Sequence, residues 1–190
     1  ANKEIKTIAI SMVLSQLYSP HFFHEMRTEK QYGYLVGVGY VPVGYYPGIA
    51  MYIQSPHTKA VDLAEAIDSF TENSAELIGG MSQQEWSQLQ KGLASQLQEV
   101  DASLRIKSQR FWGAICNQDN EFNRKIQLIE QIKALKLNDI TDFITTNLVQ
   151  TKKHDRVVLM SIKEETDKAQ LNTEALTTTE EMQKHCPTKL

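Results

Sequence analysis

The chain has 190 residues, a formal net charge of −3, and 41% hydrophobic against 23% charged side chains. These values are typical of a soluble globular protein with one domain, or with one domain and an appendage. They do not suggest nucleic-acid binding. No apolar run approaches the roughly 18 residues that a membrane helix needs, and residues 1–20 lack the pattern of a signal peptide.

The first residues carry a helical pattern. Apolar side chains recur every three or four positions, which predicts a helix over residues 3–18 with one buried stripe. The stripe consists of Ile5, Ile8, Ala9, Met12, Val13 and Leu17. A second helix is expected to open at Ser19, because Ser19 can cap a helix and Pro20 suits a first turn.

The second helix is predicted to end in a sharp corner. Gly33 would permit the turn out of the helix, and a strand would begin at Tyr34. Arg27 and Tyr34 would then lie at the two ends of one helix-to-strand corner. Taken alone, these residue types favour a structural role, in which Arg27 pairs with an acidic neighbour or solvates a helix end and Tyr34 packs in the sheet.

The remaining elements follow from periodicity and turn signals. Alternation over residues 34–43 and 49–54 around a Gly-rich turn predicts a β-hairpin. Ser82 and Glu85 form a capping box at one helix start, and Asn138 or Asp139 is expected to cap the last helix. The helices are expected at residues 58–80, 82–97, 104–116, 122–135 and 140–149, and a returning strand at 156–162.

These elements predict an α+β domain, a two-layer sandwich of a mostly antiparallel sheet with helices on one face, over residues 1–162. Three strands are few for such a helical layer, and the family resemblance described below implies that the sheet lacks its first strand or strands. The resulting open edge would favour self-association of the fragment. Residues 163–190 are polar and predicted to form a tail that buries little surface.

The sequence offers little catalytic chemistry of its own. Cys116 and Cys186 have no metal-ligand spacing, and they could pair only if the tail folds back. His21, His24 and Glu25 share one helix, but a zinc site of the inverted type needs His-x-x-Glu-His, and here the His and Glu positions are exchanged. We therefore predict no metal ligands and no cofactor in this chain.

The corner resembles the last domain of the pitrilysin/insulysin family of zinc metallopeptidases, the inverzincins. The matching residues are Ser19, Pro20, Phe22, Phe23, Arg27, Thr28, Glu29, Gln31, Gly33, Tyr34 and Val36. Weaker similarity continues through Phe111, Trp112 and Phe122, so the resemblance covers about residues 3–162. Met26 and Tyr32 replace the usual Leu residues, and both substitutes are apolar.

The resemblance implies a non-catalytic C-terminal domain, inactive alone, of a zinc endopeptidase that hydrolyses polypeptides. The zinc would lie in the parent's N-terminal domain, and the partners would be the preceding domains and the peptide substrate. Tyr34 would donate to the scissile carbonyl oxygen, and Arg27 would orient the substrate backbone. The parent would be periplasmic if a bacterial pitrilysin and otherwise cytosolic. The alternative is a non-enzymatic module of the same fold that serves assembly.

Overall fold

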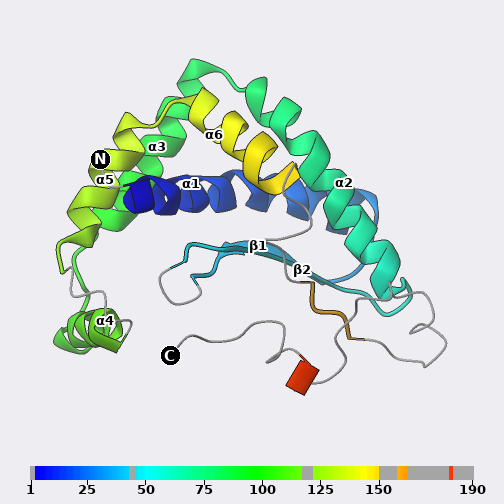
Figure 1. Cartoon of the computed structure of the whole chain (residues 1–190), viewed down its shortest axis with the longest axis horizontal. Coiled ribbons are helices and arrows are strands. Elements are labelled where there is room, and N and C mark those ends of the chain that lie inside the picture. Colours follow the sequence, from blue (N-terminus) through cyan, green and yellow to red (C-terminus); the bar gives the residue numbers. More distant parts are fainter. Residues whose placement is uncertain (1–2, 43–45, 117–121, 150–157, 162–179, 182–190) are drawn as a thin grey trace.

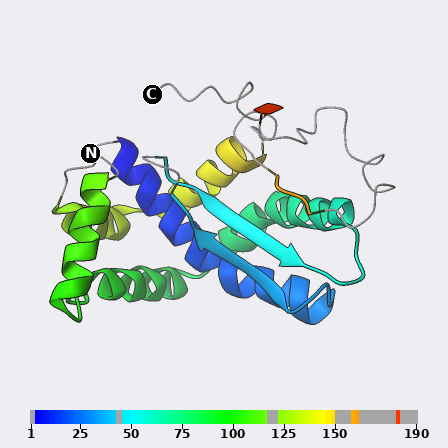
Figure 2. The same ribbon diagram turned by 90° about the horizontal axis from the view of Figure 1, so that it is seen from below.

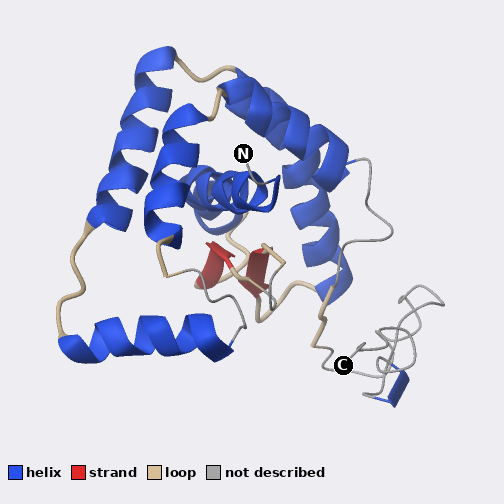
Figure 3. Cartoon of the chain, turned by 60° about the vertical axis from the view of Figure 1, so that its left-hand side comes forward, coloured by secondary structure: helices blue, strands red, loops and turns tan. Residues whose placement is uncertain are grey.

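A computed structural model describes residues 3–42, 46–116, 122–149, 158–161 and 180–181. One long helix, α1 (Lys3–Phe23), runs through the middle of the fold. It packs on both strands and on the helices α2 (Ala60–Gly79), α5 (Arg124–Ala134) and α6 (Leu137–Phe143). Figure 3 shows the helices arranged around α1, with the two strands below it.

The helix that we predicted to open at Ser19 is instead the last part of α1. Pro20 lies inside this helix, where it cannot donate the usual hydrogen bond to the carbonyl of residue 16. The apolar stripe of α1 continues without a break to Phe22, which is fully buried. Packing along this stripe therefore outweighs the local preference of Ser19 and Pro20 for a helix start.

The hairpin lies across one side of α1 (Figure 1; Figure 2). Strands β1 (Leu35–Tyr40) and β2 (Ile49–Gln54) pair antiparallel over six residue pairs, from Leu35 opposite Gln54 to Tyr40 opposite Ile49. Val36 is buried against the core, and Val38 packs at its margin. The predicted α+β class, with an antiparallel sheet and helices on one face, is confirmed.

The described residues contain two strands, not the three that we predicted. Residues 158–161, which fall within the expected strand 156–162, form no ladder with either strand. Leu159 is 83% exposed, so the apolar alternation that suggested a strand is not used to cover the core. The predicted tail lies outside the described residues, apart from residues 180–181.

The helical block matches its predicted order. Helix α3 (Gln83–Gln98) begins with the predicted capping box, in which Ser82 N–H donates to Glu85 Oε2 at 2.9 Å and Glu85 N–H donates to Ser82 Oγ at 3.3 Å. Helix α4 (Leu104–Cys116) has the predicted bounds. No helix among the described residues is long and apolar enough to cross a membrane.

The last helix begins three residues earlier than we predicted. Helix α6 starts at Leu137 and continues as a wider turn, η2 (Ile144–Val149). Asp139 lies inside its first turn, where its Oδ2 accepts a hydrogen bond from the backbone N–H of Lys136 at 2.8 Å. Its Oδ1 accepts one from Lys6 Nζ at 2.7 Å, which joins the two ends of the described helical block.

These contacts give a testable pH dependence of stability. The hydrogen bond from Lys6, followed by that from Lys136, lowers the pKa of Asp139 in the folded state. Because its pKa is lower in the folded state, the ionised Asp139 carboxylate stabilises the fold at pH values above the unfolded-state pKa of about 4. This stabilisation is lost as the pH falls through the pKa of Asp139 in the folded state. We expect Asp139→Asn to cost about 1 kcal/mol or less at pH 7, because the Lys6 side chain is 44% exposed and solvent screens its charge, and nothing near pH 2.

Urea unfolding at pH 7, 5, 3 and 2 measures this difference. The matched control is Asp142→Asn on the same helix, since Asp142 is exposed and has no ionic partner among the described residues. A loss for Asp139→Asn that stays constant from pH 7 to pH 2 would show that its carboxylate does not stabilise α6 as a charged group.

Candidate functional site

The predicted corner is built from an unusual helix end. At His24 the helix α1 widens into a π-helical segment, η1 (His24–Glu29), a geometry that is frequent at functional sites. Met26 is fully buried and fixes this segment to the core. The chain then turns at Gln31, which has a positive φ of 53°, and enters β1 after Tyr34.

Gly33 serves this corner for a different reason than we predicted. The left-handed conformation falls on Gln31, and Gly33 is instead required by close approach. A Cβ atom at position 33 would overlap the carbonyl oxygen of Gln54, at the end of β2. The backbone just before Tyr34 is therefore held directly against the hairpin.

Arg27 lies between aromatic side chains on the surface of this corner. Its guanidinium carbon is 4.8 Å from the ring centroid of Phe23 and 5.5 Å from that of Tyr34. Both distances suit a cation–π contact. Tyr34 is 88% exposed and Phe23 is 40% exposed, so the group faces solvent. Among the described residues, Arg27 and Tyr34 thus come together in space.

The donors of this cluster are unused. In the part of the chain that the structure describes, neither the Arg27 guanidinium nor the Tyr34 hydroxyl has a hydrogen bond or an ion pair. The acidic side chains of η1 are engaged elsewhere: Glu25 with Lys30 at 2.6 Å and Glu29 with His24 at 3.3 Å. Among the described residues Arg27 forms no ion pair and Tyr34 is not packed in the sheet, whereas the exposed Arg27 in η1 fits the alternative that it solvates a helix end.

Sequence reasoning missed Phe23 as the third member of the cluster. Phe23 and Arg27 are four residues apart, a spacing that brings side chains together on a helix. The signal was therefore present, but an exposed Phe in an apolar run does not stand out.

The His and Glu residues of this segment do not fit a zinc site. His24 Nε2 lies beside Glu29, and no group of three or more His, Cys, Asp or Glu side chains among the described residues could hold a metal ion. A catalytic zinc site needs three protein ligands. Cys116 is exposed, and Cys186 lies outside the described residues.

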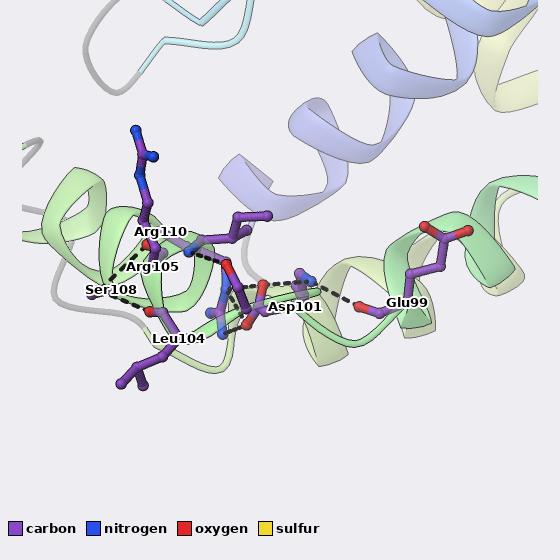
Figure 4. A network of polar contacts seen from close by, with 9 residues as sticks. Glu99, Asp101, Leu104, Arg105, Ser108 and Arg110 are labelled. Atoms are coloured by element: carbon purple, nitrogen blue, oxygen red, sulfur yellow. Dashed lines mark hydrogen bonds and ion pairs between the residues drawn. The ribbon is translucent and has the colours of Figure 1, made fainter.

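A second polar cluster joins α4 to its neighbours (Figure 4). Arg110 donates to Asp101 through Nε and Nη2, at 3.3 and 2.9 Å, and these hydrogen bonds lower the pKa of the Asp101 carboxyl. Lys125 lies 3.7 Å from the same carboxylate and donates to the carbonyl of Glu99. Because the charges of Asp101, Arg110 and Lys125 pair with one another, this cluster serves to hold the chain around α4 together.

Comparison with known proteins agrees with this architecture. The family model for PQQ synthase PqqF-like, C-terminal lobe domain 4, matches residues 13–112. Protease 3 of Salmonella typhi is 25% identical over 147 residues, which cover 77% of this chain and 15% of that protein. Coenzyme PQQ synthesis protein F of Pseudomonas aeruginosa is 29% identical over 111 residues, 58% of this chain and 14% of that protein.

A solved structure supports the same assignment. The crystal structure of pitrilysin superposes with a TM-score of 0.68 at 24% identity, over 76% of this chain and 15% of that one. The fold is thus that of a domain of a pitrilysin-type peptidase. The chain belongs to the family of PqqF-like C-terminal lobe domains, and the resemblance that we drew from the corner is confirmed. The matched part of the chain spans 15% of the length of Protease 3.

Proposed function

We propose that this chain is the zinc-free C-terminal domain of a pitrilysin-type zinc endopeptidase, in which Arg27 and Tyr34 contact the polypeptide substrate. The observation that carries the proposal is the exposed Arg27–Tyr34 pair with unused hydrogen-bond donors. Exposed charged and aromatic groups without a structural partner are typical of binding surfaces. Their presence in a family of peptidase domains supports a peptide as the ligand.

The two side chains suit complementary tasks. Arg27 presents a planar, permanently charged group that can hold carbonyl oxygens of an extended peptide. The Tyr34 hydroxyl can donate to an oxygen that becomes negative during hydrolysis, which is the role of an oxyanion donor. The zinc that activates water would be held by another domain of the parent, because the described residues do not fit that metal.

The same proposal assigns the partners. The preceding domains of the parent would bring the metal site to face this corner, and closure of the domains around the peptide would complete the site. The isolated chain would then bind peptide weakly and hydrolyse none. Its rival is the non-enzymatic assembly module, which has no use for two free donors on one corner.

Arg27→Ala in the full-length parent tests the proposal. We expect kcat/KM for peptide hydrolysis to fall about 10- to 100-fold with zinc content unchanged, because a charge-assisted contact to the substrate is lost. The matched control is Arg105→Ala, since Arg105 is also exposed and its side chain has no partner among the described residues. Equal kinetics in both variants would reject the substrate contact and favour the assembly module.

A further inference from the structure

Helix α4 carries an apolar strip that no part of the described chain covers. None of its residues is buried, and it has no extensive contact with another described helix or strand. The strip follows the helical period along one side of α4, where Leu104 is 82% exposed, Trp112 is 66% exposed and Ile115 is also exposed. Exposed apolar groups that gather in one place beside charged side chains are typical of a protein interaction site.

The charges beside the α4 strip indicate an acidic partner. Helix α4 contains Arg and Lys side chains but no Asp or Glu. Arg110 is paired with Asp101, whereas the ammonium group of Lys107 lies 5.9 Å from the centre of the Phe111 ring and forms no ion pair in the described part of the chain. Two copies of α4 packed face to face would bring like charges together, which disfavours a symmetric contact between them.

An acidic surface of this kind lies on α2 of the same protein. Helix α2 contains five Asp and Glu residues and no Lys, Arg or His. Asp62, Glu65 and Glu76 are exposed, and their carboxylates form no ion pair within the described ranges. They lie on the side of α2 opposite its buried residues. Leu77, which is 46% exposed, adds an apolar group beside Glu76. Both kinds of group on the α4 strip thus have a counterpart on α2.

We propose that α4 of one copy of this chain docks on the acidic side of α2 of a second copy. In this contact Lys107 faces the carboxylates of α2, and Trp112 and Leu104 cover Leu77. The two surfaces also match in length, because residues 104–115 span about 17 Å and residues 62–76 about 21 Å at the helical rise of about 1.5 Å per residue. The contact uses neither side chain of the Arg27–Tyr34 pair, so it does not depend on the proposed function.

The two surfaces lie on opposite sides of the fold (Figure 1; Figure 2). One chain therefore cannot pair its own α4 with its own α2. A contact between two different surfaces is head-to-tail, and each added copy leaves one surface of each kind free. Association through α4 and α2 thus gives a series of oligomers that grows with concentration, and not a single symmetric dimer.

Analytical ultracentrifugation of the 190-residue chain tests this contact. Wild type is expected to sediment as a monomer of 21.6 kDa when dilute and as larger species near about 0.5 mM, because exposed ion pairs contribute little each. Raising the salt concentration to about 0.5 M should weaken the association at least about threefold, since salt screens exposed charges. A monomer at every concentration, or an association that salt does not weaken, overturns the proposal.

Two multiple variants test the head-to-tail geometry. Lys107→Gln/Trp112→Ala removes the α4 surface, and Glu65→Gln/Glu76→Gln/Leu77→Ala removes the α2 surface. Each variant alone is expected to associate at least about tenfold more weakly than wild type. An equimolar mixture of the two should form a dimer and nothing larger, because each variant keeps one intact surface.

Lys133→Gln on α5 is the matched control. Lys133 is exposed and its replacement changes the net charge as much as Lys107→Gln does, so this variant should associate like wild type. If both multiple variants still associate like wild type, the copies meet through another surface, such as the open edge of the hairpin, and the proposal is overturned. A mixture of the two variants that remains monomeric overturns it as well.

Discussion

Tyr34→Phe in the full-length parent is expected to lower kcat/KM for peptide hydrolysis by about 10²- to 10³-fold. The substitution removes one hydroxyl group and keeps the ring that Arg27 contacts at 5.5 Å. A donor aimed at developing negative charge contributes about 2.7–4 kcal/mol to the transition state and little to the bound substrate. The loss should therefore appear mainly in kcat, with zinc content and folding unchanged.

Tyr46→Phe is the matched control for this experiment. Tyr46 is 79% exposed and lies near the hairpin turn, so it offers a free phenol at another place on the same domain. Its substitution should leave the kinetics within about twofold of wild type. If Tyr34→Phe behaves like Tyr46→Phe, the hydroxyl of Tyr34 takes no part in the reaction, and the corner binds substrate at most.

Phe22→Ala is expected to give the largest loss of stability among single changes in this chain. Phe22 is fully buried, and its ring meets that of Phe70 edge to face at a centroid distance of 5.1 Å. Tyr18 meets the same Phe70 ring at 5.2 Å, so the substitution leaves a cavity inside an aromatic cluster. Truncation of a buried Phe to Ala costs about 3–5 kcal/mol in the free energy of unfolding.

Urea unfolding of the 190-residue chain measures this loss. The neighbouring Phe23→Ala serves as control, because Phe23 is 40% exposed and should cost about 1 kcal/mol or less. A cost for Phe22→Ala similar to that for Phe23→Ala would show that the aromatic cluster does not stabilise the domain. Such a result would also weaken the view that α1 organises the core.

The strongly periodic parts of the fold could be predicted from sequence. The bounds of α4 in the structure equal the predicted ones. The start of α3 was predictable because the capping-box signal lies within four residues, from Ser82 to Glu85. The path of the chain before β1 was harder to predict. Pro20 suggested a helix start because local preference was judged without the buried stripe that carries α1 past it.

The returning strand was the least predictable element. A strand is defined by its pairing partner, and the apolar alternation over residues 156–162 does not indicate which edge of the sheet this segment would pair with. For the site, residue types alone left Arg27 and Tyr34 ambiguous between structure and binding. The resemblance to a peptidase family made them candidates for substrate binding, and only the coordinates could show that their donors are unused among the described residues and that Phe23 joins them.

The tight packing of Gly33 on the Gln54 carbonyl links the position of Tyr34 to the register of the hairpin. A shift of two residues between β1 and β2 would keep every side chain on its face, yet it would remove the surface on which the corner rests. The six residue pairs between β1 and β2 thus help to fix the position of Tyr34, although Tyr34 belongs to none of them. The position of Tyr34 therefore depends on the alignment of the two strands as well as on the residues of the corner itself.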